Sequence, residues 1–239
     1  MLAGGNILFY YVYLQPQPVT APPEITPQFN TYTQSLPIST KPISLTLSNS
    51  YGQVDINSPQ QNTETQVIFN TLDSRPIITE ETTNDIKLIS LERSGIEANS
   101  QYYKNSSINL SSLQSYKEFI FSLQYSNGNF DFSTIPSLEN LFLKVQQASA
   151  TIILPKTPLT ISQLWRIENN NGDVTMTIDP NTPIKITIQN TNTIQQIPNW
   201  LIRDENGAYM SPALQQNPNQ PFINLTLSGS NNLYTINPQ

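Results

Sequence analysis

The sequence of 239 residues contains no cysteine and no histidine, and charged residues are scarce. These two absences exclude a disulfide scaffold, thiolate zinc sites, imidazole metal ligands and nucleophiles activated by histidine. Charged residues make up 12 % of the chain, about half of the share usual in globular proteins. No Gly-x-Ser-x-Gly, Ser-x-x-Lys or phosphate-binding loop sequence occurs. The sequence therefore predicts a protein that is not an enzyme and that uses no cofactor and no metal.

The few charges are unevenly distributed along the chain. The first 40 residues contain one charged residue, Glu24, and none follows Glu205. Uncharged ends rich in amides suit surfaces that pack against other subunits, because burying an amide costs less than burying an ion. A chance distribution in a low-charge chain is the alternative. The net charge of −6 also predicts no binding to nucleic acid, because binding requires a basic surface.

What the chain does contain is neutral polar residues and short alternating runs. Asn, Gln, Ser and Thr supply about 40 % of the residues. Roughly a dozen runs that alternate apolar and polar residues, such as 43–47, 117–125 and 222–227, are typical of β-strands. This pattern predicts an all-β protein built as one or two jelly-roll-like antiparallel β-sandwiches, with an extended N-terminal arm and one short helix.

Turn residues divide these runs. Asn-Gly pairs stand at 127–128, 171–172 and 206–207, and such pairs favour two-residue hairpin turns. The pair at 171–172 predicts a hairpin between strands at 161–167 and 173–178, and a strand at 184–188 would extend that hairpin into a three-stranded meander. In the segment before this meander, Leu138, Leu141, Phe142 and Val145 recur at helical spacing behind Ser137, which favours a helix. A strand over 141–145 is the alternative.

These elements suggest an order of domains along the chain. We expect an extended arm over 1–38, a β-sandwich domain over 39–132, a helical connector over 133–150 and a second β-rich domain over 151–239. The arm begins with a strand that is apolar on both faces and continues into a proline-rich segment that favours extended chain. We expect this strand to insert into a neighbouring subunit or to contact a lipid surface, although a place inside its own domain is the alternative. The residues of the predicted assembly arm are Ile7, Leu8, Phe9, Tyr10, Tyr11, Val12, Tyr13 and Leu14.

Other candidate sites are weaker. Asn169–Asp173 places oxygen-bearing side chains at alternate positions but lacks the glycine and the glutamate that a calcium loop requires. Adjacent carboxylates at 80–81 and 204–205 would point to opposite faces of a strand, so they do not form a catalytic pair. Trp165 and Trp200 could line a sugar-binding face, but aromatic residues in strands more often fill a core.

Taken over the whole chain, this neutral composition, the serial strands and the proline-rich arm resemble the vertex, penton-base or spike proteins of tailless icosahedral viruses with an internal membrane. The resemblance implies a virion structural protein with no enzymatic activity, located in the capsid. Its partners would be copies of itself and other capsid proteins, and it could contact a membrane surface or a host receptor. The alternative is an extracellular or cell-surface β-sandwich module, or a filament or adhesin subunit, that recognises carbohydrate or assembles by strand addition.

Overall fold

The computed structural model describes residues 30–60, 64–71, 77–83, 86–92, 105–135, 137–156, 158–189 and 193–239. Most of them lie in strands, which confirms the all-β class. The described residues include one α-helix, α2 (Pro212–Gln216), and none that is long and apolar enough to cross a membrane. The strands are β1 (Asn30–Leu36), β2 (Ile43–Gln60), β3 (Thr65–Thr71), β4 (Ile77–Thr83), β5 (Ile86–Glu92), β6 (Asn105–Ser111), β7 (Tyr116–Asp131), β8 (Asn140–Gln146), β9 (Ser149–Ile153), β10 (Gln163–Asn170), β11 (Asp173–Ile178), β12 (Ile184–Gln189), β13 (Thr193–Gln196), β14 (Ile202–Arg203), β15 (Tyr209–Met210), β16 (Ile223–Ser230) and β17 (Asn232–Pro238).

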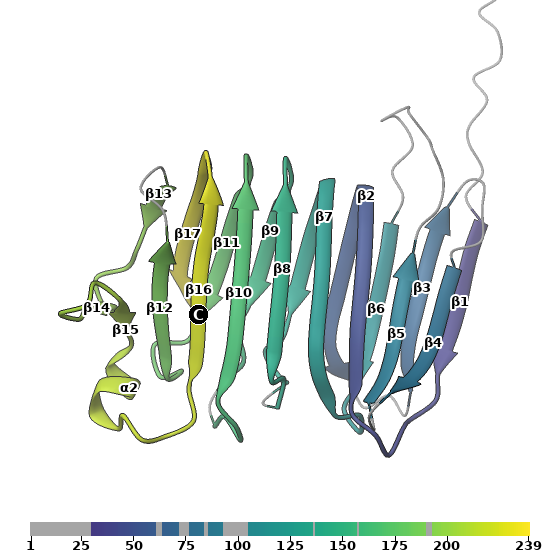
Figure 1. Cartoon of the computed structure of the whole chain (residues 1–239), viewed down its shortest axis with the longest axis horizontal. Helices are drawn as coiled ribbons and strands as arrows, with labels where there is room; N and C mark the ends of the chain where they lie inside the picture. The colour runs from purple at the N-terminus through teal and green to yellow at the C-terminus, as the bar shows by residue number, and fades with distance from the viewer. Residues whose placement is uncertain are drawn as a thin grey trace, which may run out of the picture.

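The strands form two facing layers that run as parallel ladders through the centre of the molecule (Figure 1). The first layer contains the beginning of β2 and β7, followed by β8, β10, β16 and β12. The second layer contains the ends of β2 and β7, followed by β9, β11, β17 and β13. The long strands β2 and β7 bend and belong to both layers. Each rung is thus one first-layer strand and one second-layer strand, and a sharp corner joins them in the rungs whose connection the structure describes.

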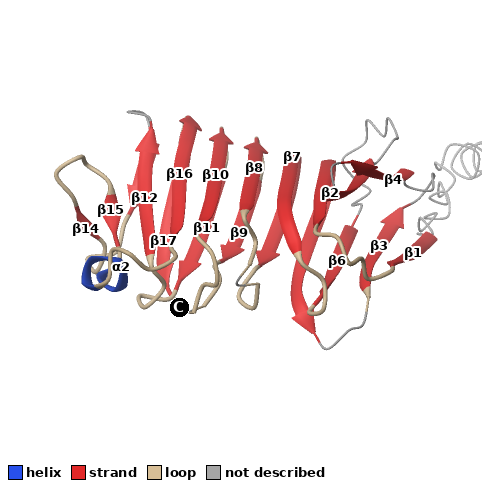
Figure 2. Ribbon diagram, turned by 60° about the horizontal axis from the view of Figure 1, so that its bottom comes forward, coloured by secondary structure: helices blue, strands red, loops and turns tan. Residues whose placement is uncertain are grey.

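The order of the rungs differs from their order in the sequence. The last rung of the chain, β16–β17, lies between β10–β11 and β12–β13. The outer rung β12–β13 therefore comes first in the sequence, and β16–β17 then fills the space between it and β10–β11. The connection between these two rungs carries β14, β15 and α2, which lie at the same end of the stack as β12 (Figure 2).

Antiparallel pairing is found at both ends of the stack. At one end, β3 pairs antiparallel with β1 and with β6, and β4 pairs antiparallel with β5. At the other end, β15 pairs antiparallel with β14 and with Lys185 and Ile186 of β12. The predicted antiparallel sandwich is therefore right in its facing layers and wrong in the direction of its central strands.

The core lies between the two layers and is continuous from Leu36 to Ile236. Strict alternation puts apolar side chains inside, as in β8, where buried and half-buried residues alternate. Rings gather near β7: Phe119 stacks on Phe121 and Phe132, and Trp165 meets Phe132 edge to face with ring centroids 5.5 Å apart. The strand β8 pairs with β7 and β10, and β9 pairs with β7 and β11. Both strands therefore lie inside the stack, and one core spans the described chain.

The predicted helical connector over 133–150 is wrong. Residues 140–146 and 149–153 form β8 and β9. Leu141 and Val145 are buried, whereas Phe142 is half-buried on the outer face, so the period of burial is two. The apolar residues at helical spacing include one that faces outward, and pairing with β7 and β10 overrides the local preference for helix.

The predicted hairpin at 171–172 is also wrong, and with it the three-stranded meander. The strands β10 and β11 lie in different layers and pair in parallel with neighbouring rungs. Asn171 alone has a positive φ at this position, 57°, whereas the expected turn needs two such residues. The Asn-Gly pair at 127–128 lies within β7, and only the pair at 206–207 lies in a hairpin loop, between β14 and β15.

The structure changes the limit of the predicted arm. Ile7–Leu14 lie outside the described residues, so the assembly-arm prediction remains a prediction. The last part of the segment 1–38 is strand β1, which pairs with β3 and buries Leu36 to 1 % exposure. Residues 30–36 therefore belong to the folded stack.

The loop between β14 and β15 contains a carboxylate, that of Asp204, whose protonation should change the local structure. The Asp204 carboxylate accepts hydrogen bonds from the backbone N–H of Ala208 and of Asn206, at 2.8 and 2.9 Å, and Lys185 Nζ lies 3.5 Å away. The hydrogen bond from Ala208 is the main cause that lowers the pKa of Asp204 below its ordinary 3.8. A lowered pKa gives stability above the unfolded-state value that is lost as the pH falls through the folded-state value.

We therefore expect the Ala208 amide to be protected from hydrogen exchange at pH 5 and to lose that protection only below about pH 4. Exchange measured by NMR across pH 2–6 tests this, and the Asp204→Asn variant should remove the pH dependence at this amide. A titration midpoint at or above 3.8 for the Asp204 carboxyl would contradict the prediction.

Candidate functional site

The corners between the two layers are made by single residues with left-handed backbone conformation. Tyr125, Gln147, Asn171 and Asn231 have φ values of 50°, 47°, 57° and 49°. Few residues other than glycine adopt this conformation, and Asn is enriched among those that do. Each corner follows an alternating strand directly, so the chain turns from one layer into the other without a longer loop. We call these four positions the corner residues.

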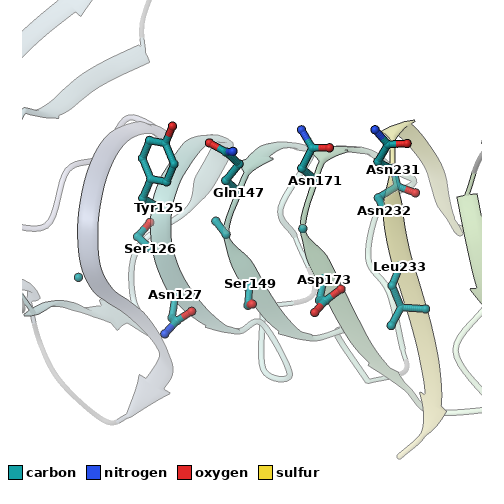
Figure 3. A pocket seen from close by; sticks show the side chains of 13 residues that line it. Tyr125, Ser126, Asn127, Gln147, Ser149, Asn171, Asp173, Asn231, Asn232 and Leu233 are labelled. Atoms are coloured by element: carbon teal, nitrogen blue, oxygen red, sulfur yellow. The ribbon is translucent and has the colours of Figure 1, made fainter. Parts of the chain in front are cut away.

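The strand register brings the corner residues side by side (Figure 3). Gln124 pairs with Gln146 and Asn127 with Ser149, which places Tyr125 next to Gln147. The same reasoning places Gln147 beside Asn171, and Asn171 beside Asn231. All four side chains are exposed. They form a row across four rungs at the strand spacing of about 4.8 Å.

A shallow groove of about 950 Å³ runs along this row. Figure 3 shows a second row of side chains beside the corner residues, which consists of Asn127, Ser149, Asp173 and Leu233. The lining residues are Gly52, Tyr125, Ser126, Asn127, Gln147, Ala148, Ser149, Asn171, Gly172, Asp173, Asn231, Asn232 and Leu233. Asp173 is the one charged residue in this set. We call this feature the corner groove.

Backbone hydrogen bonds continue through the corners and hold the groove in shape. Asn171 N–H donates to the carbonyl of Ser230 at 3.0 Å, and Leu233 N–H donates to that of Gly172 at 3.1 Å. Beneath the corners, the side-chain amide of Asn169 donates to the carbonyl of Gly172 at 2.8 Å, and that of Asn232 donates to the carbonyl of Asn169 at 2.6 Å. These hydrogen bonds therefore fix the backbone that carries the exposed corner residues.

Tyr234 adds a further anchor below the groove. Its hydroxyl donates to the carbonyl oxygens of Ser228, at 2.6 Å, and of Ile167, at 3.2 Å. Burial raises the pKa of Tyr234 well above its ordinary range, so the hydroxyl stays a donor at neutral pH. This side chain ties β17 to the first layer just past the corner.

Polar groups in and under the groove have unused hydrogen-bonding capacity. The side-chain amides of Gln147, Asn171 and Asn231 make no hydrogen bond within the part of the chain that the structure describes. Ser126 Oγ and Asn232 Oδ1 are buried and line the groove, and they too have no partner among the described residues. Buried polar atoms are rarely left unsatisfied, so the groove suits a hydrated, polar ligand.

The structure places the candidate site residues named from the sequence in different environments. Trp165 is fully buried in the core, which excludes it from a sugar-binding face. In the calcium-like sequence 169–173, Asn169 points into the core and Asn171 points outward, and the described residues contain no group of three acidic side chains that could hold a metal. A second groove, of about 410 Å³, lies beside the ion pair of Lys117 and Glu139.

Sequence reasoning missed the corner groove. Its signal is a polar residue followed by one that is no larger, directly between two alternating runs. The pairs are Tyr125-Ser126, Gln147-Ala148, Asn171-Gly172 and Asn231-Asn232. Because each pair is too short to look like a loop, only the repetition of the pattern could have indicated a stack of corners.

Comparison with known proteins places the fold. No family model matches the sequence, and no curated protein matches it. A crystal structure of a Clostridium sporogenes protein, described as a candidate cell adhesion protein, is similar with a TM-score of 0.76 at 15 % identity, covering 89 % of this chain and all of that one. A candidate adhesin from Bacteroides fragilis matches with a TM-score of 0.36 at 8 % identity, over 88 % of this chain and 98 % of its own. The first likeness shows a shared fold.

Proposed function

We propose that this protein is an extracellular or cell-surface binding module of the adhesin type, and that the corner groove is its binding surface. The observation that carries the proposal is the row of exposed, uncharged hydrogen-bonding side chains across four successive rungs. The likeness in fold to a candidate cell adhesion protein supports it. The proposed activity is binding without chemical change, because the groove offers amides and hydroxyls but one carboxylate.

A cell-retention assay tests this proposal. Full-length protein is immobilised, and the retention of bacterial and animal cells is compared with that on a variant whose groove is blocked by Ser149→Trp. Ser149 is exposed at the start of β9 and lines the groove, so a large ring there fills the groove from outside the core. Retention by the wild type and its loss in the variant support the proposal. No retention of any cell type, or equal retention by both proteins, contradicts it.

Assembly by strand addition is a second candidate function. Among the described residues β13 pairs with β17 alone, so its other edge is open, and β15 covers only Lys185 and Ile186 of β12. An open edge accepts an added strand through backbone hydrogen bonds. The sequence of Ile7–Leu14, apolar on both alternating faces, suits such a donor strand. The virion hypothesis shares this self-assembly and stays a prediction.

We predict that deleting residues 1–28 converts an oligomer into a folded monomer. The deletion removes the predicted donor strand and leaves β1, which pairs with β3, in place. Native mass in solution is compared between the full-length and shortened proteins, and circular dichroism reports whether the strands remain. A full-length protein that is already a monomer would contradict the assembly hypothesis and leave the binding proposal untouched.

A further inference from the structure

We infer that the corner groove binds a linear, uncharged polysaccharide that lies across the rungs of the stack. The inference rests on the proposed function, because it names the ligand class of the same groove. It begins from the repeat of the site. The corner residues offer one polar side chain for each rung, at a spacing of about 4.8 Å. Four rungs span about 14 Å, so a ligand that uses the whole row is extended and presents similar groups at regular intervals.

The chemistry of the row fits hydroxyl groups. A side-chain amide offers two N–H donors and a carbonyl acceptor, and a sugar hydroxyl both donates and accepts. Three successive corner residues, Gln147, Asn171 and Asn231, carry such amides. A pyranose unit in an extended chain is close to one strand spacing in length, so successive sugars can meet successive corners. Their amides make no other hydrogen bond within the described residues and are ready to bind.

One end of the row offers a different kind of contact. Tyr125 is 44 % exposed and stands beside Gln147. The apolar face of a sugar ring packs on an aromatic ring. A sugar at this end would therefore be held by its face, and the sugars along the amides would be held by their edges.

Charge selects against anionic polymers. The groove contains one charged side chain, Asp173, and the whole chain carries a net charge of −6. Among the described residues that line the groove, none is a cation that could pair with a uronic acid, sulfate or phosphate. Repulsion between like charges disfavours an acidic polysaccharide and a nucleic acid alike, which leaves neutral polymers as the favoured class.

The rigid mounting of the row favours binding. The backbone hydrogen bonds through the corners and the buried amide of Asn169 hold the corner residues before any ligand arrives. Each amide bond to a sugar in water adds little by itself. Because the backbone of the row is already fixed, a ligand orders only the amide side chains as it binds, so affinity should grow with the length of the polysaccharide until the row is filled.

The test uses a variant in which three corner residues become glycine, Gln147→Gly, Asn171→Gly and Asn231→Gly. Glycine adopts their left-handed conformation without strain, so the variant removes the amides and keeps the corners. The matched control, Thr151→Ala, Thr175→Ala and Thr235→Ala, changes outward-facing residues of the same rungs outside the groove. Full-length proteins are titrated with linear neutral glucans, mannans and galactans, their short oligomers, and anionic polygalacturonate and alginate.

We expect at least one neutral polymer to bind the wild type and the threonine control equally, and the glycine variant at least about tenfold more weakly. Tighter binding of an anionic polymer, or undiminished binding by the glycine variant, would overturn the inference. Cell retention that requires the groove, combined with no binding to any neutral polymer, would also overturn it while leaving the adhesion proposal standing. Melting temperatures confirm that all three proteins are folded.

Discussion

Replacing Trp165 by alanine should destabilise the protein by about 3–5 kcal/mol, which is the cost of removing a large aromatic side chain from a packed core. Trp165 is fully buried in β10 and meets Phe132 edge to face. Its removal leaves a cavity between the two layers at the centre of the stack. Urea unfolding followed by circular dichroism measures the change in the free energy of unfolding.

The neighbouring residue gives a matched control. Leu164 precedes Trp165 in the same strand but is 55 % exposed on the outer face, so Leu164→Ala should change stability by no more than about 0.5 kcal/mol. Trp165→Phe should cost less than Trp165→Ala, because it keeps a ring and removes an indole N–H that has no partner among the described residues. Equal losses for the alanine variants at 164 and 165 would contradict the assignment of the inner face.

Gly229→Ala should be the second large effect, at about 2–5 kcal/mol of destabilisation. Gly229 has a φ of 127°, and a Cβ there would overlap the carbonyl oxygen of Asn169 in the neighbouring rung. Both the backbone conformation and the close approach of two rungs therefore require glycine. The overlap is with backbone, which cannot move aside without disturbing the ladder between β10 and β16.

Gly207→Ala separates these two causes. Gly207 also has a positive φ, 83°, but the nearest neighbour of an added Cβ would be the end of the long Arg203 side chain, at 3.3 Å, and not backbone. This variant should show only the conformational cost, about 1–2 kcal/mol. Thermal or urea unfolding of both variants measures the difference, and a loss at position 207 as large as that at 229 would show that rung contact contributes nothing.

The sequence predicted the class of fold from the period of the strands, and that part was confirmed. The run 117–125 lies within β7, and the run 222–227 lies in β16 except for its first residue. Strand direction could not be obtained in this way, because alternation is the same in parallel and antiparallel strands. The direction follows from what joins the strands, and here the joints are single residues such as Asn171.

The corner groove could not be predicted from the sequence for the same reason. An Asn-Gly pair indicates a turn, but it does not say whether the turn is a hairpin or a corner between layers. At 206–207 the pair lies in a hairpin loop; at 171–172 it is a corner. Neighbouring rungs decide the outcome, since β8 and β16 pair with β10 on both sides and leave no edge for β11. The row of corner residues exists only once the rungs are stacked.

The position of β16–β17 after β12–β13 in the sequence has a consequence for how the protein folds. These residues follow β12–β13 in the sequence, yet they lie between β10–β11 and β12–β13 in the stack. The rung β12–β13 therefore cannot pair in its final place until residues 223–238 have been made. Such long-range closure slows folding. A chain cut short before residue 223 would lack the rung between β10–β11 and β12–β13, and proteases would meet unpaired strand edges on both of these rungs.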